Sequence, residues 1–400
     1  MQKKYAAPRD ATDAANDPVS RAQRVVEVVK AAAPRIEAER QVPDDVMAAL
    51  HKERLFRVLL PGSLGGDAAD LVTFAKVIET IACVDASTAW CLGQGGGCAM
   101  GAAFLEPAAA LRLFGAANAV LAWGAGIQGK ATAVDGGYRV SGAWSFNSGS
   151  RQATLLGAHS FIFERDGSPR RRPDGRQLDR TLLLARNKAK VHDVWQVVGL
   201  KGTGSDTFEV QDLFVPEDET IDRENPAELH DDAPIFQFPG TLAYAAGFCS
   251  LMLGLARGQL NELNKLAQTK TPRGAPSSLL ESPVFQTQYS ILEARQRSLR
   301  AYLHQTVGEI YQSVADGNPL SYEQRASLKL ATTYGINEGV EIATEAYRAA
   351  GATAIFLGNP FERRMRDALT ASQQTQGRGT NYLTVGRCLL GLPPDTTMFL

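Results

Sequence analysis

The sequence lacks a surplus of charge of either sign and lacks any long apolar run. Its 400 residues carry 42 basic and 43 acidic side chains, a net charge of -1, so nothing favours nucleic acid as a partner. No apolar run approaches the roughly 18 residues that a membrane-spanning helix needs. The N-terminal segment is polar and has no apolar core of a secretory signal. We therefore expect a cytoplasmic protein that binds neither nucleic acid nor a membrane.

Cysteine and histidine are scarce and poorly grouped. The five cysteines contain no CxxC pair and lie far apart, at Cys83, Cys91, Cys98, Cys249 and Cys388. An odd, scattered set is typical of free thiols in a reducing compartment rather than of disulfides or a zinc site. The histidines do not show the HExxH spacing of a helical metal site, so we expect no metal.

Two common catalytic motifs are also missing. The glycine run Gly93-Gln-Gly-Gly-Gly97 follows no strand pattern and does not have the G-x-G-x-x-G spacing of a dinucleotide-binding turn. No G-x-S-x-G elbow is present, which argues against a hydrolase of the α/β type. We therefore expect any nicotinamide cofactor to be bound by a separate protein.

Hydrophobic periodicity divides the chain into three regions, which we predict to be an N-terminal helical domain at residues 1–117, a β domain at 118–225 and a C-terminal helical bundle at 226–400. In the first region, Asp44 and Asp45 after Pro43 predict a helix start, and apolar residues at helical spacing predict helices over residues 71–81 and from Ser87 onward. The whole is an α+β fold.

The middle region predicts a compact antiparallel β-barrel or sandwich. Short β-like runs such as YRVSGAWSF, TLLLAR and FEVQDLFV are separated by glycine, aspartate and proline. The last region returns to helical spacing over residues 251–266, 285–315, 322–351 and 362–390. Four such lengths predict a four-helix bundle that also supplies an oligomer interface.

The segment GGYRVSGAWSFNSG at residues 136–149 is the strongest candidate for a cofactor site. Strand alternation predicts that Trp144 and Phe146 share one face and form a wall for a flavin ring, followed by the Ser148 hydroxyl and the flexible backbone of Gly149. The alternative is an ordinary aromatic hairpin. A second loop, Gly202-Thr203-Gly204-Ser205, offers amides and hydroxyls for a phosphate or a ring edge, or is simply a turn.

Several motifs make the chain resemble the acyl-CoA dehydrogenase superfamily over residues 42–392. The flavin-facing strand of that family is similar to Trp144-Ser-Phe-Asn-Ser148-Gly149, and its bundle is similar to Gly254-Leu-Ala-Arg257, to Gln286 after Pro283-Val-Phe, and to the segment from Pro360 through Arg366-Asp367. The closest resemblance is to the reduced-flavin-dependent two-component monooxygenases of the hydroxyphenylacetate, steroid-phenol and dibenzothiophene type.

The chain departs from this pattern at the catalytic positions. Where the dehydrogenases have a glutamate base after the Arg-Asp pair, this chain has Thr375, which leaves Glu338 and Glu341 as fallback bases. Where the monooxygenases commonly have a histidine, it has Gln374, and a second histidine of that branch falls near Cys98. No histidine follows His304, so phenol activation by an imidazole from the last helices is not available.

The resemblance implies FAD or FMN as cofactor, supplied reduced by a separate NAD(P)H-flavin reductase, with O2 and a small organic substrate. We assign Ser148, Gln374 and Arg257 as catalytic residues: Ser148 near the ring nitrogen N5, Gln374 to orient substrate, and Arg257 to offset the charge of reduced flavin, unless Arg257 forms a structural ion pair. The cofactor-binding set is Trp144, Phe146, Ser148, Gly149, Gly202, Thr203, Gly204, Ser205 and Gln286.

The remaining expectations concern the bundle and the alternatives. We expect Arg366 and Asp367 to form a buried structural pair, Arg363 and Arg364 to lie at the surface or an interface, and the protein to be a homotetramer. The alternative functions are an FAD-containing acyl-CoA dehydrogenase that passes electrons to another carrier, and a degenerate family member without activity.

Overall fold

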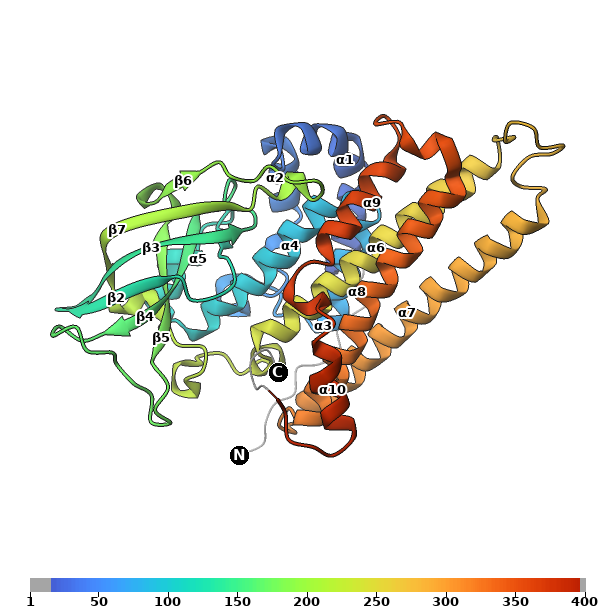
Figure 1. Cartoon of the computed structure of the whole chain (residues 1–400). Helices are drawn as coiled ribbons and strands as arrows, with labels where there is room; N and C mark the ends of the chain where they lie inside the picture. The colour runs from blue at the N-terminus through green and yellow to red at the C-terminus, as the bar shows by residue number, and fades with distance from the viewer. Residues whose placement is uncertain (1–15, 396–400) are drawn as a thin grey trace.

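The computed structural model describes residues 16–395 and has a β-sheet at one end, a bundle of long helices at the other, and helix α4 between them (Figure 1). This arrangement confirms the predicted fold class. Most of the polar N-terminal segment, in which we expect no secretory signal, lies outside the described residues.

The N-terminal helices begin at acidic caps. The carboxylates of Asp17, Asp70 and Asp85 accept hydrogen bonds from backbone N–H groups in the first turns of α1, α3 and α4. Acidic residues also occupy the first turn of α2, as predicted from Asp44 and Asp45. The five helices are α1 (Pro18–Glu39), α2 (Asp44–Lys52), α3 (Leu71–Ala82), α4 (Ala86–Ala99) and α5 (Pro107–Phe114).

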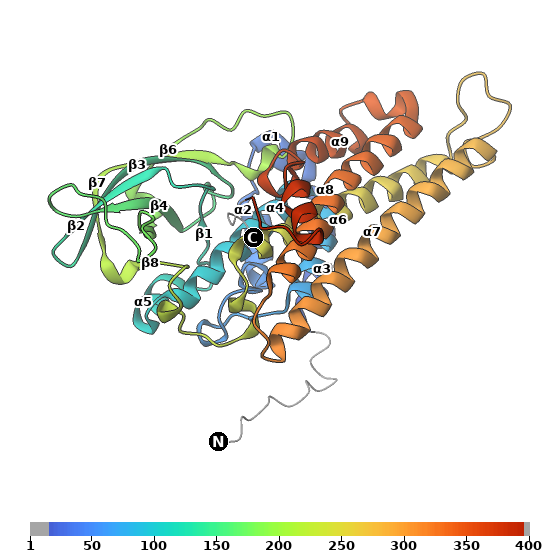
Figure 2. The same ribbon diagram turned by 60° about the horizontal axis from the view of Figure 1, so that its bottom comes forward.

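The sheet is mixed, whereas only antiparallel pairing was predicted. Its order is β6-β7-β3-β2-β4-β5-β8, with β1 beside β4, and both β1 and β2 run parallel to β4. Figure 2 shows that the sheet is curved, and buried side chains from its strands form a core of their own. A parallel neighbour requires a crossover. Strand β3, which pairs antiparallel with β2, and residues 148–154 together form this crossover from β2 to β4. The strands are β1 (Leu121–Ala122), β2 (Gly129–Val134), β3 (Gly137–Asn147), β4 (Leu155–Phe163), β5 (Asp179–Ala185), β6 (Lys190–His192), β7 (Asp206–Pro216) and β8 (Thr220–Ile221).

The C-terminal region contains three long helices and two short ones, namely α6 (Gly240–Ala267), α7 (Pro283–Ala315), α8 (Tyr322–Ala350), α9 (Pro360–Ala371) and α10 (Asn381–Leu389). The continuous helix predicted over residues 362–390 is wrong, because the chain leaves the helix after Ala371 and resumes at Asn381. The Asn381 amide donates to the carbonyls of Thr375 and Gln376, so these groups are satisfied outside a helix. Among residues 16–395, no helix combines the length and apolarity needed to cross a bilayer.

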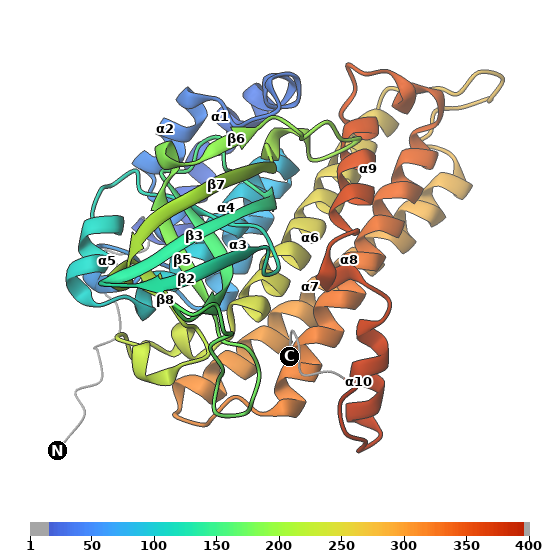
Figure 3. The same cartoon turned by 60° about the vertical axis from the view of Figure 1, so that its left-hand side comes forward.

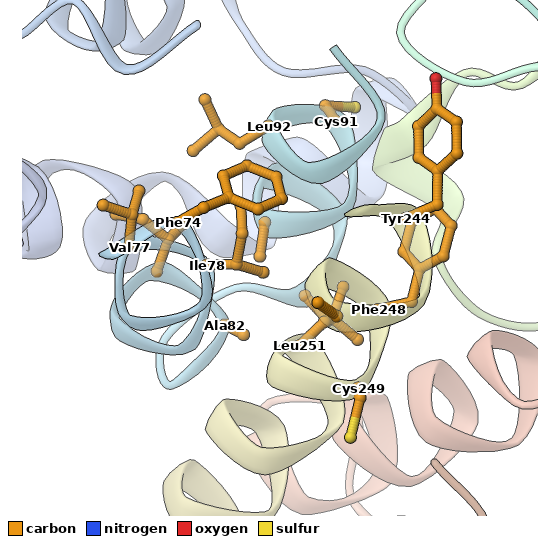
Figure 4. Packing of buried hydrophobic residues seen from close by; sticks show 14 of the residues in the cluster. Phe74, Val77, Ile78, Ala82, Cys91, Leu92, Tyr244, Phe248, Cys249 and Leu251 are labelled. Atoms are coloured by element: carbon orange, nitrogen blue, oxygen red, sulfur yellow. The ribbon is translucent and has the colours of Figure 1, made fainter. Parts of the chain in front are cut away.

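Helix α4 packs unusually close to aromatic rings because one stretch of it is glycine. A Cβ at Gly97 would come within 2.2 Å of the Tyr244 ring, and a Cβ at Gly96 within 2.8 Å of the Phe74 ring. Figure 4 shows Phe74 from α3 and Tyr244 and Phe248 from α6 around this helix. The glycine run that lacks dinucleotide-binding spacing therefore serves close packing between the N-terminal helices and the bundle.

The same helix carries two buried cysteines. Cys91 is 5% exposed and Cys98 is fully buried, and burial raises the pKa of each thiol to about 12. Cys249 on α6 is also buried, with a raised pKa. All five cysteines are free thiols, as predicted.

The close packing of α4 predicts opposite effects for two glycine substitutions. Gly97→Ala forces a methyl group into the Tyr244 ring and should lower the free energy of unfolding by about 1–3 kcal/mol. Gly93→Ala is the matched control, because its nearest neighbour is 3.8 Å away and the better helix propensity of alanine should raise stability by about 0.5–1 kcal/mol. Chemical denaturation of both variants checks this, and equal stability of the two would contradict the packing.

Candidate functional site

Ser148 lies at one end of β3, in a chain of hydrogen-bonded hydroxyl groups. The indole N–H of Trp90 on α4 donates to its Oγ at 2.8 Å, and Ser148 Oγ lies 2.8 Å from Ser205 Oγ. Ser205 Oγ in turn lies 2.7 Å from Thr203 Oγ1, which donates to the carbonyl of Leu200 at 2.9 Å. The structure thus brings together the two loops that the sequence proposed separately.

The backbone also joins these loops. The N–H of Gly149 donates to the carbonyl of Thr203 at 2.8 Å. Gly149 has φ of +78°, a conformation that favours glycine. The amides of Thr203 and Gly204, however, donate to carbonyls within their own turn. The loop over residues 202–205 therefore presents hydroxyl groups toward Ser148 rather than the predicted open nest of amides.

Trp144 and Phe146 do not share a face, contrary to prediction. Trp144 is fully buried in the core of the β domain, where its ring stacks on Phe208 with centroids 4.9 Å apart. Phe146 is 67% exposed. A bulge between Trp144 and Asn147, together with φ of +61° at Phe146, breaks the alternation of side chains along the strand. Of these two rings, Phe146 is the one that is accessible to a ligand.

The exposed ring of Phe146 is supported by Trp195. The two rings meet edge to face with centroids 6.1 Å apart, and the Trp195 indole N–H donates to the carbonyl of Leu200 at 3.0 Å. The Leu200 carbonyl is therefore the common anchor of the aromatic pair and of the hydroxyl chain. Leu200 itself has φ of +53°, which is strained for a side-chain-bearing residue.

The Leu200 peptide is held from the bundle by Asp367. The carboxylate of Asp367 on α9 accepts a hydrogen bond from Leu200 N–H at 2.6 Å. Figure 3 shows the segment between β6 and β7 reaching across to α9. Burial, with a smaller contribution from nearby Asp85, raises the pKa of the Asp367 carboxyl to about 7 against the opposing effect of this hydrogen bond.

The arginines around Asp367 correct two expectations. Arg366 pairs with Glu37 at 2.9 Å and with Glu362 at 2.7 Å rather than with Asp367. Arg364 is buried rather than at the surface, and donates to the carbonyl of Cys83 at the C-terminal end of α3.

Arg257 and Gln286 lie in the helical bundle. The guanidinium of Arg257 pairs with Glu293 at 2.6 Å and donates to Gln296, which is the structural ion pair that was the alternative interpretation. Phe248 of α6 stacks on Trp90, which donates to Ser148. Arg257 follows Phe248 by nine residues, so it lies ~13 Å farther along the helix axis. The Gln286 amide donates to the carbonyl of Leu280 at the start of α7. Within residues 16–395, neither side chain is hydrogen-bonded to the Ser148 hydroxyl chain.

Gln374 lies in the turn between α9 and α10. Its Oε1 accepts a hydrogen bond from the backbone of Gln376 at 2.8 Å, while its Nε2 is buried without a hydrogen-bond partner in residues 16–395. An unpartnered buried amide is costly unless a ligand or water accepts its proton. Neither fallback base is well placed, because Glu338 pairs with Arg295 and Glu341 is exposed.

Cys98, at the position of the second missing histidine, lies in a buried polar cluster. The Tyr244 hydroxyl donates to its sulfur at 3.4 Å, and Gln94 donates to the carbonyl of Trp123 at 2.9 Å. The sequence prediction gave Trp90, Trp195 and Tyr244 no part in the site, and it gave the buried Asp367 the wrong partner. No pattern identified in the sequence indicated the roles of Trp90, Trp195 and Tyr244.

Comparison with known proteins agrees with the fold. Residues 19–109 match the family model described as "Acyl-CoA dehydrogenase, N-terminal domain", and residues 246–376 match "Acyl-CoA dehydrogenase, C-terminal domain". Indole-3-acetate monooxygenase of Pseudomonas putida is 30% identical over 360 residues, covering 89% of each chain. The oxygenase subunit HsaA, a flavin-dependent monooxygenase of Rhodococcus jostii, is 26% identical over 90% of this chain and 94% of its own. The structure of XiaF from Streptomyces with FADH2 and glycerol superposes with a TM-score of 0.88 at 22% identity, covering 96% of this chain and 98% of its own.

The chain belongs to the acyl-CoA dehydrogenase family. Within that family it is a flavin-dependent monooxygenase, which acts with reduced flavin, O2, a flavin reductase and a small substrate. The residues present fit a flavin, since an exposed aromatic ring at Phe146 lies two residues from a hydroxyl group at Ser148. Residues 16–395 contain no group of three histidine, cysteine, aspartate or glutamate side chains that could hold a metal.

The raised pKa of Asp367 predicts a pH dependence of stability. With a folded-state pKa of about 7 against the ordinary value of 3.8 for aspartate, the folded protein retains a proton that the unfolded chain releases. This contribution is fully present below about pH 4 and is lost as the pH rises through about 7, a decrease of up to about 4 kcal/mol in the free energy of unfolding. Asp367→Asn removes the titration and should flatten the curve.

Urea denaturation at about pH 5 and about pH 8 measures this difference between wild type and variant. Glu341→Gln, which removes an exposed carboxyl on α8, is the control and should leave the slope with pH unchanged. An unaltered slope in Asp367→Asn would show that Asp367 is ionised in the folded protein throughout this range.

Proposed function

We propose that this protein is the oxygenase component for a small aromatic acid, with indole-3-acetate as the first substrate to test. The proposal takes its substrate class from the 30% identical relative that is named for indole-3-acetate. The observation that carries it is the hydroxyl chain ending at Ser148 beside the exposed ring of Phe146. FMN or FAD, reduced by a separate NAD(P)H-dependent reductase, supplies the activation of O2.

The proposed roles go to the predicted site residues that are not fully occupied by structural contacts. Phe146 covers one part of the ring system, and Ser148 accepts a hydrogen bond from its reactive edge. Gln374 turns its unpartnered Nε2 toward the substrate. Arg257, Gln286 and the buried Trp144 have structural contacts that account for them, so the proposal gives them no part in the chemistry.

This assignment needs no imidazole. An electron-rich indole carbon can be oxygenated without first removing a proton from a substrate hydroxyl, so the replacement of histidine by Gln374 and Cys98 is compatible with it. The dehydrogenase alternative requires a base, and Thr375 cannot act as one at neutral pH. With Glu338 held by Arg295, the proposal favours oxygenation over acyl-thioester oxidation.

We also propose that four copies of the chain assemble through the bundle. Large apolar side chains are exposed on α7, between α8 and α9, and on α10, namely Val284, Ile291, Ile355, Phe356, Leu357, Leu383, Leu389 and Leu390. Exposed apolar residues in such numbers are typical of an oligomer interface.

The catalytic proposal predicts incorporation of one atom of O2 into product. With reductase, NADH, FMN or FAD, indole-3-acetate and isotopically labelled O2, mass spectrometry should find one labelled oxygen per product molecule. Ser148→Ala should lower product formed per flavin oxidised by up to about tenfold, through loss of one hydrogen bond. Ser141→Ala, which removes a half-buried hydroxyl of β3 that accepts from the Asp212 N–H, is the control. Flavin oxidation without labelled product from any aromatic acid, together with oxidation of an acyl thioester, would favour the dehydrogenase instead.

The assembly proposal predicts a change in mass on altering the bundle surface. Ile291→Glu places a charge among the exposed apolar residues of α7 and should reduce the mass measured by light scattering from that of a tetramer to that of a smaller species. Leu111→Glu on α5 is the control, since this residue is 62% exposed but belongs to the N-terminal helices. A wild-type protein that is monomeric at micromolar concentration would contradict the proposal.

A further inference from the structure

The hydroxyl chain at Ser148 has a fixed direction, because its two ends have opposite hydrogen-bonding character. At one end the indole of Trp90 can only donate, and it donates to Ser148 Oγ. At the other end the carbonyl of Leu200 can only accept, and it accepts from Thr203 Oγ1. The three hydroxyl groups between these ends each have one proton.

The direction of every bond in the chain follows from these ends. Thr203 uses its proton on the Leu200 carbonyl, so at the 2.7 Å contact Ser205 must donate to Thr203. Ser205 has then used its own proton, so at the 2.8 Å contact Ser148 must donate to Ser205. Ser148 has no proton left for a ligand and keeps one lone pair, because the other accepts from Trp90.

We propose, building on the function proposed above, that Thr203 and Ser205 are positioning residues that make Ser148 a hydrogen-bond acceptor and thereby select reduced over oxidised flavin. Ring nitrogen N5 carries a proton in reduced flavin and only a lone pair in oxidised flavin. An acceptor at Ser148 therefore stabilises the reduced form, whereas in oxidised flavin it would set two lone pairs against each other. The selection rests on the direction of the hydrogen bonds in the hydroxyl chain and not on the presence of the Ser148 hydroxyl alone.

The structure also holds the hydroxyl chain rigidly at its accepting end, the Leu200 carbonyl. The Leu200 carbonyl accepts from Trp195 Nε1 at 3.0 Å and from the backbone of Thr203 at 3.1 Å in addition to the Thr203 hydroxyl. The Leu200 N–H is fixed by Asp367 from α9. Removal of the Thr203 hydroxyl therefore leaves the carbonyl with two donors and the turn with its main anchors, so the loop should keep its conformation.

Thr203→Val tests the proposal, because valine has nearly the shape of threonine and lacks the proton. Ser205 would then lose its acceptor and turn its proton to Ser148, which would free the Ser148 proton to donate to the lone pair of oxidised N5. We expect the variant to bind reduced FMN and FAD more weakly and oxidised FMN and FAD more tightly. The ratio of the two dissociation constants should change by about tenfold. Thr203→Ser restores the hydroxyl and should restore the ratio.

Anaerobic titrations of the whole protein with oxidised and with dithionite-reduced FMN and FAD, followed by tryptophan fluorescence, measure this ratio. Thr207→Val is the matched control, because its hydroxyl donates to Ser145 on the neighbouring strand, outside the chain. Equal weakening of both redox forms in Thr203→Val, with the ratio unchanged, would overturn the proposal while leaving the monooxygenase function intact. A wild-type protein that binds neither form of either flavin would overturn the proposed function and this inference together.

Discussion

The close contact between helix α4 and the aromatic rings around it is the constraint on which the other features depend. Without side chains at Gly96 and Gly97, the helix can approach Phe74 and Tyr244 from two different parts of the protein. Its Trp90 stacks on Phe248 of the bundle at 4.0 Å and reaches Ser148 of the β domain with its indole nitrogen. One helix thus sets the distance between the bundle and the sheet. The candidate site lies at the contact between this helix and the β domain.

The second connection between the β domain and the bundle is the peptide of Leu200. Its N–H binds the Asp367 carboxyl, and its carbonyl holds both the Thr203 hydroxyl and the Trp195 ring. A left-handed residue with a side chain costs of order 1–2 kcal/mol, so it persists only where several contacts hold it. The candidate site is therefore assembled from loops whose geometry is imposed by neighbouring helices, which is consistent with a site on a rigid framework.

The sequence predicted the parts of this protein that depend on local patterns. Helical spacing located α3 and α4, Asp44 and Asp45 located the start of α2, and the patterns of residues 136–149 and 202–205 predicted the two loops that the structure joins. The parallel placement of β4 beside β2 could not be predicted, because it depends on a crossover rather than on strand propensity. The positions of Trp144 and Phe146 were wrong because a bulge reverses the face of the strand, and alternation alone cannot show a bulge. The expected pairing of Asp367 with Arg366 was wrong, because its actual partner Leu200 lies 167 residues earlier in the chain.

The buried thiols of α4 have a consequence for oxidative damage to this enzyme during turnover. A flavin that reacts with O2 releases some hydrogen peroxide, and peroxide attacks thiolates far faster than thiols. Because Cys91 and Cys98 have pKa values of about 12, almost none of either is a thiolate at neutral pH. Peroxide should therefore oxidise other side chains before it oxidises the thiols of α4. The packing of this helix against the bundle and the β domain should persist during such oxidation.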